Sequence, residues 1–515
     1  MLQIKNLTIL HKKDFRVILE DFNCVLNDGD KAVIIGEEGD GKSTLLQWIY
    51  CPELIEDYCE ATGERITQGE RLGYLPQELP RADREKSVYE YFAQEALFWE
   101  QTPKELGGMA RAFGLPPDFF YGEQRMGSLS GGEKVKVQML RLLFAQPDIL
   151  LLDEPSNDID IETLEWLERL ILDWKRSVLF ISHDETLIER TANMVVHIEQ
   201  IRRKTRSRYT VVHKPYRQYR QERQEQFERQ AQEAANDRRE KKIRDEKLHR
   251  IYQSVETAQN TVSRQAPSVG KRLKKKMHFM KSVQRRFERE DEEMTEIPEE
   301  ESAIFFKLGD ETAKIPEGKR VLELSMEALC TPDGARVLAR NIELRLRGAE
   351  KICIVGANGA GKTTLLHALA EELLSRTDIR AEYMPQNYEE LLNRCATPTA
   401  FLAQSGDKEE LTRIRTYLGA LKYTADEMEH TVAELSGGQK AKLLLLKMSL
   451  SGANVLLLDE PTRNFSPLSG PVIRRLLRAF PGAIISISHD RKYIREVCDK
   501  VYRLTAEGLA VDEVF

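Results

Sequence analysis

The sequence predicts an α/β fold in which two similar domains are joined by a long antiparallel α-helical hairpin. Its 515 residues leave room for two or three domains. Four motifs of the first half return in the second half in the same order, and a polar stretch of helical composition separates the halves. We therefore expect one domain over residues 1–200, a helical-hairpin linker over 201–319 and a second domain over 320–515.

The four motifs keep their spacing as well as their order. GEEGDGKST (36–44) returns as GANGAGKTT (356–364), LSGGEK as LSGGQK, ILLLDEPS as VLLLDEPT and FISHD as SISHD. In both halves the Asp of LLLDE follows the Ser of LSGG by 23 residues, and the His of ISHD follows that Asp by 30. This match predicts a duplicated nucleotide-binding domain.

Each copy has the pattern of a parallel sheet covered by helices. KAVIIG (31–36) and KICIVG (351–356) are short apolar runs that enter a Gly-rich turn and then a helical pattern. The apolar runs that lead into LLLDE and ISHD predict further buried strands in both copies.

The linker predicts two helical arms. Residues 216–257 are polar and almost free of Gly and Pro, a breaker-rich tip is expected at about 258–271, and a helix resumes over 271–293. Because the arms are unequal, either residues 294–310 return in extended form or the tip folds back. An apolar seam between the arms is expected from Leu273, Met277, Met280, Val283 and Phe287, opposite Leu248, Tyr252 and Val255.

The linker is also strongly basic. Residues 201–290 hold 27 Lys and Arg against 11 Asp and Glu, so this stretch carries +16 in a chain whose net charge is -7. A local contact with a polyanion would explain this asymmetry; a solvated coiled coil is the alternative, chiefly for 216–250, where acids offset the bases. KRLKKKMHFMKSVQRR (271–286) contains no acid, which favours the polyanion. The candidate RNA-binding residues are Arg264, Lys271, Arg272, Lys274, Lys275, Lys276, His278 and Lys281.

Composition argues against several other classes of protein. No apolar run approaches the roughly 20 residues that span a bilayer, and the N-terminus lacks the pattern of a secretory leader. The seven cysteines include no CxxC pair, which argues against disulfide frameworks and structural zinc. We expect reduced thiols and a cytoplasmic protein.

The GxxxxGK[ST] motif of each copy predicts a phosphate cradle. Its glycines let backbone N–H groups approach the β- and γ-phosphates, its Lys supplies positive charge, and its hydroxyl faces Mg²⁺. The expected cofactors are ATP and Mg²⁺. The expected cradle residues are Gly36, Gly39, Gly41, Lys42, Ser43 and Thr44 in the first copy, and Gly356, Asn358, Gly359, Gly361, Lys362, Thr363 and Thr364 in the second.

The LLLDE and ISHD motifs supply the remaining groups for hydrolysis. The Asp of LLLDE would stand in the magnesium shell, and the following Glu would orient and deprotonate water. A Gln in GYLPQE or EYMPQN could bridge the metal and this water. The expected catalytic residues are Glu154, Glu460, His183, His489, Gln77 and Gln386, and the expected metal ligands are Ser43, Gln77, Asp153, Thr363, Gln386 and Asp459.

With these flanking motifs, LSGGE and LSGGQ resemble the ATP-binding cassette superfamily over about 400 residues. The resemblance implies head-to-tail pairing of the two cassettes within one monomer, with two ATP molecules at their interface. Each signature would then complete the site of the other cassette. The resemblance assigns Ser436, Gly437 and Gly438 to the site of Lys42, and Ser130, Gly131 and Gly132 to the site of Lys362.

Tandem cassettes joined by a charged hairpin resemble the ABC-F family. The resemblance implies binding at the exit-tRNA site of the 70S ribosome, with the hairpin directed at the peptidyl-tRNA, large-subunit rRNA and the peptidyl transferase centre. EPTRNFSPLS (460–469) resembles the bacterial antibiotic-resistance members, which protect ribosomes from drugs of the large subunit.

Three alternatives are open. The protein could be a translation factor for stalled or initiating ribosomes without a role in resistance. It could be the ATPase subunit of a membrane transporter, although the hairpin and the fused cassettes argue against a membrane partner. It could also be a DNA-directed ATPase, although no DNA partner is expected. A DNA-directed ATPase would carry far longer coiled coils or zinc cysteines.

The two copies also differ. Asp160 ends the first D-loop motif, whereas Ser466 holds the matching position, so unequal hydrolysis is expected. Phe15 could stack on adenine, and its counterpart is Ala335. From Lys to signature Ser is 88 residues in the first copy and 74 in the second, an excess too short for an additional helical arm.

Overall fold

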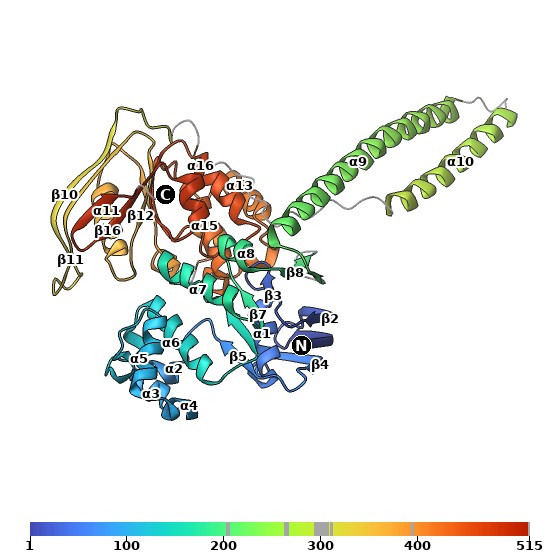
Figure 1. Cartoon of the computed structure of the whole chain (residues 1–515). Helices are drawn as coiled ribbons and strands as arrows, with labels where there is room; N and C mark the ends of the chain where they lie inside the picture. The colour runs from blue at the N-terminus through green and yellow to red at the C-terminus, as the bar shows by residue number, and fades with distance from the viewer. Residues whose placement is uncertain (202–205, 262–266, 293–307, 310–312, 393–395, 513–515) are drawn as a thin grey trace. The chain divides into compact units, whose positions relative to one another are not determined.

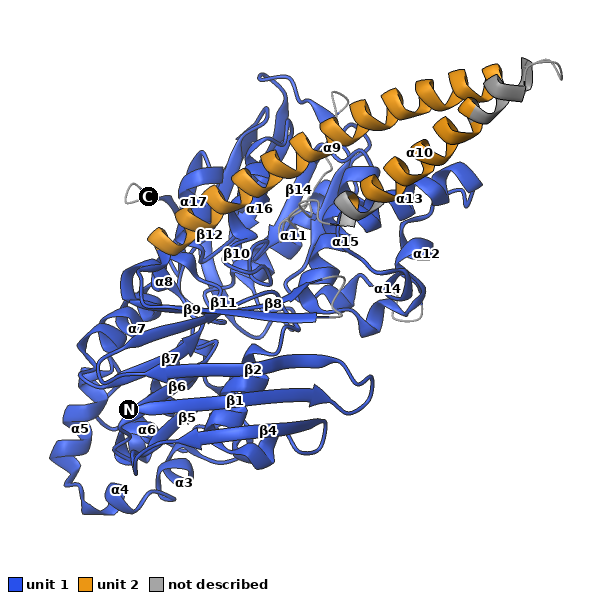
Figure 2. Cartoon of the chain, turned by 90° about the vertical axis from the view of Figure 1, so that its right-hand side faces the viewer, with its two compact units in different colours: residues 1–216, 301–515 blue, residues 217–300 orange. Residues whose placement is uncertain are grey.

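The computed structural model describes residues 1–201, 206–261, 267–292, 308–309, 313–392 and 396–512 (Figure 1). The chain divides into two compact units, of which one contains residues 1–216 and 301–515 and the other contains residues 217–300 (Figure 2).

The first half of the larger unit contains the expected α/β core. In its described residues a six-stranded sheet has the order β5-β6-β7-β3-β8-β9, and a three-stranded antiparallel sheet has the order β2-β1-β4. The strands are β1 (Leu2–His11), β2 (Val17–Leu26), β3 (Lys31–Ile35), β4 (Cys59–Ile66), β5 (Leu72–Leu75), β6 (Ile149–Asp153), β7 (Ser177–Ile181), β8 (Met194–Ile201) and β9 (Arg206–Val212). The helices are α1 (Lys42–Tyr50), α2 (Arg81–Arg84), α3 (Val88–Phe92), α4 (Ala96–Glu100), α5 (Pro103–Ala112), α6 (Gly131–Phe144), α7 (Ile161–Asp173) and α8 (Glu185–Thr191).

The second half repeats this architecture. Its described residues form a six-stranded sheet of order β13-β14-β15-β12-β16-β17 and a two-stranded sheet of β10 and β11. The strands are β10 (Arg320–Cys330), β11 (Val337–Arg347), β12 (Lys351–Val355), β13 (Ala381–Met384), β14 (Val455–Asp459), β15 (Ala483–Ile487), β16 (Lys500–Thr505) and β17 (Gly508–Val511). The helices are α11 (Lys362–Leu374), α12 (Pro398–Leu402), α13 (Lys408–Ala420), α14 (Ala425–Glu429), α15 (Gly437–Leu450), α16 (Gly470–Arg478) and α17 (Arg491–Val497).

The strand that leads into each phosphate loop lies inside its sheet. β3 pairs in parallel with β7 and β8, and β12 pairs in parallel with β15 and β16. Every residue of β3, β6, β7 and their counterparts is buried, as expected for strands covered on both faces. The carboxyl ends of these strands therefore meet at one edge, where ligands bind in open α/β sheets.

β4 accounts for most of the extra length of the first half. From Lys42 to the start of β5 is 30 residues, whereas from Lys362 to the start of β13 is 19. β4 pairs antiparallel with β1 over this stretch. The added strand supports the expectation that this excess adds no helical arm.

The smaller unit contains the predicted helical hairpin. α9 (Tyr216–Thr261) and α10 (Pro267–Glu292) are its arms, so the helices continue into both ends of the segment predicted as a tip at 258–271. That tip was predicted too long because Pro267 occupies the first position of α10, where a missing N–H costs nothing. The return segment falls largely outside the described residues.

Side chains from both arms meet in the hairpin. Val255 of α9 and Met280 of α10 are buried. The Arg244 guanidinium lies over the Phe287 ring, 4.3 Å from its centroid, and Lys241 pairs with Asp291 at 2.8 Å. The predicted seam is thus continued by polar contacts near the end of α10.

Candidate nucleotide sites

Each phosphate loop connects a central strand to the N-terminus of a helix. Gly36, Gly39 and Gly41 have positive φ, as do their counterparts in the second loop. A Cβ on Gly36 would lie 2.4 Å from the Ile198 carbonyl oxygen, so this position requires glycine. The loop can therefore turn its amides toward a ligand at the start of α1.

The two phosphate-loop lysines lie across their loops. Lys42 Nζ donates to the Gly36 and Glu37 carbonyl oxygens at 3.1 and 2.8 Å. Lys362 Nζ donates to Gly356 and Ala357 at 2.8 and 3.0 Å. Each ammonium is held where helix N–H groups also converge, which is the charge arrangement that phosphates require.

Each site also pairs a hydroxyl with a carboxylate. Ser43 Oγ donates to Asp153 Oδ1 at 2.9 Å, and Thr363 Oγ1 donates to Asp459 Oδ2 at 3.0 Å. Burial raises the pKa of Asp153 to about 6 and also raises the pKa of Asp459. These oxygen donors fit Mg²⁺, and a cation there would favour the ionised carboxylates.

The first glutamate after LLLD has several partners. Glu154 accepts hydrogen bonds from Gln77 Nε2 at 3.1 Å and from Asn157 Nδ2 at 2.5 Å, and His183 Nε2 lies 3.1 Å from its other oxygen. Burial raises the pKa of Glu154, but His183 and Lys42 outweigh burial and lower it to about 2. Glu154 is therefore an ionised carboxylate near neutral pH.

The matching glutamate of the second site has a different environment. Glu460 Oε2 accepts from the His489 backbone N–H at 3.3 Å, and His489 Nε2 lies 3.7 Å from Oε1. Glu460 Oε1 and His489 Nδ1 are buried without a hydrogen-bond partner among the described residues. Burial and the adjacent Asp459 raise the pKa of Glu460 to about 8, while burial and Lys362 lower the pKa of His489 to about 3.

The two matching glutamines have different partners in the structure. Gln77 contacts Glu154, as just described, whereas Gln386 Nε2 donates to Asp158 of the first half at 3.1 Å. Arg463 holds the same carboxylate with two contacts of 2.8 Å. Arg463 occupies the register position of Asn157, so the amide that contacts Glu154 has no equivalent beside Glu460.

The first signature faces the second phosphate loop. Both border a cavity of about 730 Å³. Ser130 and Ser436 cap their own helices through capping boxes, which leaves the glycine N–H groups for a ligand. The cavity is lined by predicted residues of both halves: Ser130, Gly131, His183, Asn358, Gly359, Gly361, Lys362, Thr363, Thr364, Gln386, Asp459, Glu460 and His489.

The second signature lies against the first phosphate loop. The Glu38 carboxylate accepts a hydrogen bond from the Gly438 backbone N–H. Lys442 Nζ lies 3.6 Å from Glu37 Oε1. Sequence reasoning missed Glu37 and Glu38; the available signal was that Ala357 and Asn358 replace them in the second loop.

The loops at Phe15 and at its counterpart Ala335 differ between the two halves. Phe15 has a positive φ and is 79% exposed, so its ring is accessible to a ligand. In the second half Arg336 and Leu338 line the cavity beside the phosphate loop.

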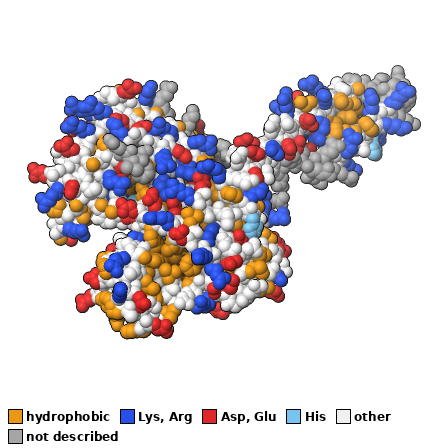
Figure 3. Space-filling model, viewed as in Figure 1, with side chains coloured by type: hydrophobic (Ala, Val, Ile, Leu, Met, Phe, Trp, Pro, Cys, Tyr) orange, Lys and Arg blue, Asp and Glu red, His pale blue; other side chains and the backbone are white. Residues whose placement is uncertain are grey.

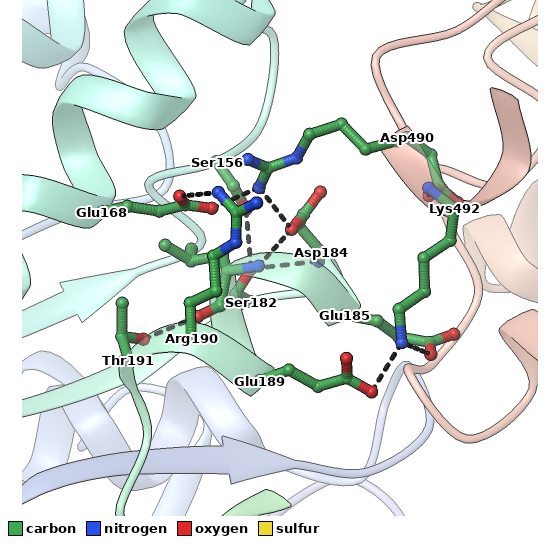
Figure 4. Close-up of polar contacts among 12 residues, drawn as sticks. Ser156, Glu168, Ser182, Asp184, Glu185, Glu189, Arg190, Thr191, Asp490 and Lys492 are labelled. Atoms are coloured by element: carbon green, nitrogen blue, oxygen red, sulfur yellow. Dashed lines mark hydrogen bonds and ion pairs between the residues drawn. The ribbon is translucent and has the colours of Figure 1, made fainter. Parts of the chain in front are cut away.

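Buried ion pairs join the two halves beyond the ISHD motifs. Arg474 of α16 and Glu185 of α8 are each 3% exposed and pair at 2.7 Å. Lys492 of α17 reaches both Glu185 and Glu189, at 2.9 and 2.6 Å (Figure 4). Arg491 pairs with Glu168 of α7. The first half supplies the acids of this interface and the second half supplies the bases.

The hairpin presents most candidate RNA-binding residues at its surface. Figure 3 shows Lys and Arg side chains along the hairpin beside a patch of apolar side chains. Phe279 is 67% exposed, whereas Met280 is buried in the seam. Arg264 lies outside the described residues, and the Lys271 side chain is likewise not described. The exposed candidates are Arg272, Lys274, Lys275, Lys276, His278 and Lys281.

Among the helices that the structure describes, none combines the length and the apolar character needed to cross a bilayer.

Comparisons with known proteins agree with this architecture. A family model described as "ABC transporter" matches residues 19–157 and 339–463, just over half of the chain. The probable ATP-binding protein YheS of Escherichia coli K12 is 26% identical over 95% of this chain and 77% of its own length. ABC transporter F family member 4 of Arabidopsis thaliana is 25% identical over 93% of this chain and 70% of its own.

A solved structure shares the fold. It is the complex of the archaeal ribosomal stalk protein aP1 with the archaeal ribosome recycling factor aABCE1. The match has a TM-score of 0.57 at 17% identity and covers 98% of this chain and 89% of the other.

Proposed function

Because the chain belongs to the ABC transporter family and is an ATPase with two such cassettes, we propose that it is a ribosome-binding ATPase of the ABC-F type. ATP would close its cassettes and thereby drive the basic hairpin toward the peptidyl-tRNA and the peptidyl transferase centre. The exposed basic face of α10 is the observation that carries this proposal.

At each nucleotide site the chain supplies groups for binding and for proton transfer. Lys42 and Lys362 would hold the phosphates. The hydrogen-bonded pairs Ser43–Asp153 and Thr363–Asp459 would hold Mg²⁺. Bound Mg²⁺ would neutralise charge on the phosphates.

Closure brings the signature of one half onto the nucleotide of the other. Glu154 then accepts a proton from the attacking water, while His183 orients this carboxylate. Nδ1–H of His183 donates to the Phe465 carbonyl oxygen at 2.9 Å, so the second half fixes the orientation of this imidazole. Proton transfer at the first site therefore depends on the contact between the two halves.

Charge and geometry support a ribosomal partner for the hairpin. Nucleic-acid backbones are dense polyanions, and Lys and Arg contacts to them provide most of the sequence-independent affinity. Phe279 is the exposed aromatic side chain that could stack on an unpaired base. The proteins that this chain resembles include an archaeal ribosome recycling factor and a member of the F family of ABC transporters.

Protection from antibiotics of the large subunit is the finer form of the proposal. It rests on the resemblance of residues 460–469 to resistance proteins. The alternative is a translation factor for stalled or initiating ribosomes. Expression in a drug-sensitive host separates the two: an increase in the inhibitory drug concentration supports protection, and unchanged susceptibility with intact ribosome binding supports the translation factor.

Charge reversal of the hairpin tests the ribosomal proposal. Replacing Lys274, Lys275 and Lys276 with Glu should abolish co-sedimentation with ribosomes and leave ATP binding intact. Replacing Arg238, Arg239 and Lys242 with Glu is the matched control, because it makes the same change of charge where acids already offset the bases. Equal ribosome binding by both triple variants would refute the role of α10.

A further inference from the structure

The first phosphate loop carries an acidic side chain at the place where a phosphate is expected. Glu38 lies between the loop glycines, and its carboxylate accepts a hydrogen bond from Gly438 N–H of the opposite signature. A Cβ on Gly437 would lie 3.1 Å from both oxygens of this carboxylate. The carboxylate thus sits over both signature glycines.

Gly437 and Gly438 are the first residues of α15, a helix of 14 residues. Unpaired N–H groups and the helix dipole make such a terminus attractive to anions. In the proposed mechanism the same N–H groups bind the γ-phosphate of ATP held by Lys42. One N–H group cannot donate a full hydrogen bond to a carboxylate and to a phosphate at the same time. The two anions also repel each other.

The second site has a different arrangement at the matching position. Asn358 replaces Glu38, and its Nδ2 donates to the Asp158 carbonyl oxygen at 2.6 Å. The acid near this loop is instead Asp160 of the D-loop, whose Oδ2 accepts from Asn358 N at 3.4 Å. In the first site the D-loop position is Ser466. Acidic residues therefore stand at both loop pairings, but at the first they belong to the phosphate loop and at the second to the D-loop region.

We propose that Glu38 is an internal competitor for the γ-phosphate at the first nucleotide site. This inference rests on the nucleotide sites of the proposed function but not on its ribosomal partner. Glu38 holds the second signature against the first phosphate loop, and Lys442 with Glu37 adds a second contact. ATP must displace this carboxylate, so its apparent association constant is the intrinsic constant multiplied by the fraction of molecules in which the signature is unblocked.

The competition is specific for the triphosphate. The contact blocks the signature rather than the phosphate-loop lysine, and ADP has no γ-phosphate to reach the signature. Removing the carboxylate should therefore strengthen ATP binding and leave ADP binding nearly unchanged. A charge-assisted hydrogen bond of ordinary strength corresponds to about a tenfold change in a binding constant.

The test compares ATP and ADP binding to the first site alone. In the full chain with Lys362→Ala, which disables the second phosphate loop, fluorescent ATP and ADP analogues are titrated into Glu38, Glu38→Asn and Glu38→Gln proteins. Asn is the residue of the second loop, and Gln keeps the side-chain length while removing the charge. Glu20→Gln, at an exposed position of β2, controls for the change in net charge.

The expected result is about tenfold tighter ATP binding by Glu38→Asn, a similar direction for Glu38→Gln, and less than a twofold change for ADP. Equal ATP affinity in all four proteins would overturn the inference, as would an equal gain for ATP and ADP. Ribosomes are absent from this experiment, so its failure leaves the ribosomal proposal standing. Loss of all ATP binding in the Lys362→Ala protein would contradict the assignment of the first nucleotide site. That result would overturn both this inference and the proposed two-site ATP mechanism.

Discussion

At the scale of single residues, Glu154 and Glu460 occupy matching places but differ in protonation. Both have positive φ directly after a buried strand, with values of 49° and 51°. Gln77, Asn157 and His183 surround the first carboxylate. Glu460 instead accepts longer hydrogen bonds from Ser488 Oγ at 3.4 Å and from the His489 backbone N–H at 3.3 Å. The local backbone is therefore conserved between the halves, and the side chains around it set the difference.

This difference predicts two pH profiles for ATP hydrolysis. A general base acts in its deprotonated form, whose fraction rises as the pH passes above the pKa. With Glu154→Gln, only Glu460 remains, and its pKa of about 8 predicts a rate that rises about tenfold per pH unit below 8 and then levels. With Glu460→Gln, only Glu154 remains, and its pKa of about 2 predicts a flat rate between about pH 5 and 9.

Steady-state ATP hydrolysis by the two single variants measures these profiles. The double variant supplies the background rate. Superimposable profiles would show that the two glutamates have the same protonation in the working enzyme, contrary to the contacts seen here.

At the scale of helices and strands, the interface between the halves depends on charge. α7 and α8 present Glu168, Glu185 and Glu189, and α16 and α17 present Arg474, Arg491 and Lys492. Such an arrangement favours pairing of unlike halves within the chain, because two copies of the same half would place like charges together.

Removing one member of a buried pair leaves the other charge desolvated. Arg474→Met should lower the free energy of unfolding by about 3 kcal/mol, because Arg474 and Glu185 are almost fully buried. Arg475→Met, at the exposed neighbouring position, should change it by less than about 0.5 kcal/mol. Urea unfolding measures both values, and equal effects would contradict the assigned role of the Arg474 pair.

Sequence patterns predicted the elements that carry local signals. The Gly-rich turns, LLLDE strands and signature helices have fixed residue spacing, and the polar arms lack helix breakers. The antiparallel strands β4, β9 and β17 were not anticipated, because they adjoin none of the repeated motifs. The buried ion pairs of residues such as Arg491 were not predicted, because their partners lie about 300 residues away in the sequence. In the sequence alone such residues look like the solvated face of a helix.

The candidate site shows the same division. Local spacing identified the phosphate loops, the Ser43–Asp153 pair and the Glu154–His183 neighbourhood. It did not identify Arg463 or Glu38, whose partners belong to the other half of the chain. Contacts between halves depend on how two surfaces fit, and single-sequence periodicity carries no information about this fit.

At the scale of the whole molecule, loop contacts between the halves link the two candidate nucleotide sites. His183 of the first half contacts the Phe465 carbonyl of the second, and Asp158 of the first half contacts Gln386 and Arg463 of the second. A nucleotide at either site would therefore contact a site built from both halves. The proposed ATP-controlled clamp requires such a link, because a ligand can shift a conformational equilibrium only when the two states bind it differently.

Binding of the basic arm to RNA should depend strongly on salt. Each phosphate contact by Lys or Arg releases counterions, so ribosome affinity should fall steeply between about 50 and 200 mM salt. Replacing Lys274, Lys275 and Lys276 with Ala should reduce the slope of log affinity against log salt by about 2 to 3. Sedimentation across a salt series gives these slopes; an unchanged slope would place the RNA contacts elsewhere.

The most direct test of the proposed function uses the Glu154→Gln/Glu460→Gln double variant. Removing both bases should leave ATP binding intact and hold the cassettes closed. We predict that this variant co-sediments with ribosomes when ATP is present and remains in the supernatant without nucleotide. Failure to co-sediment despite verified ATP binding would contradict the ribosomal account.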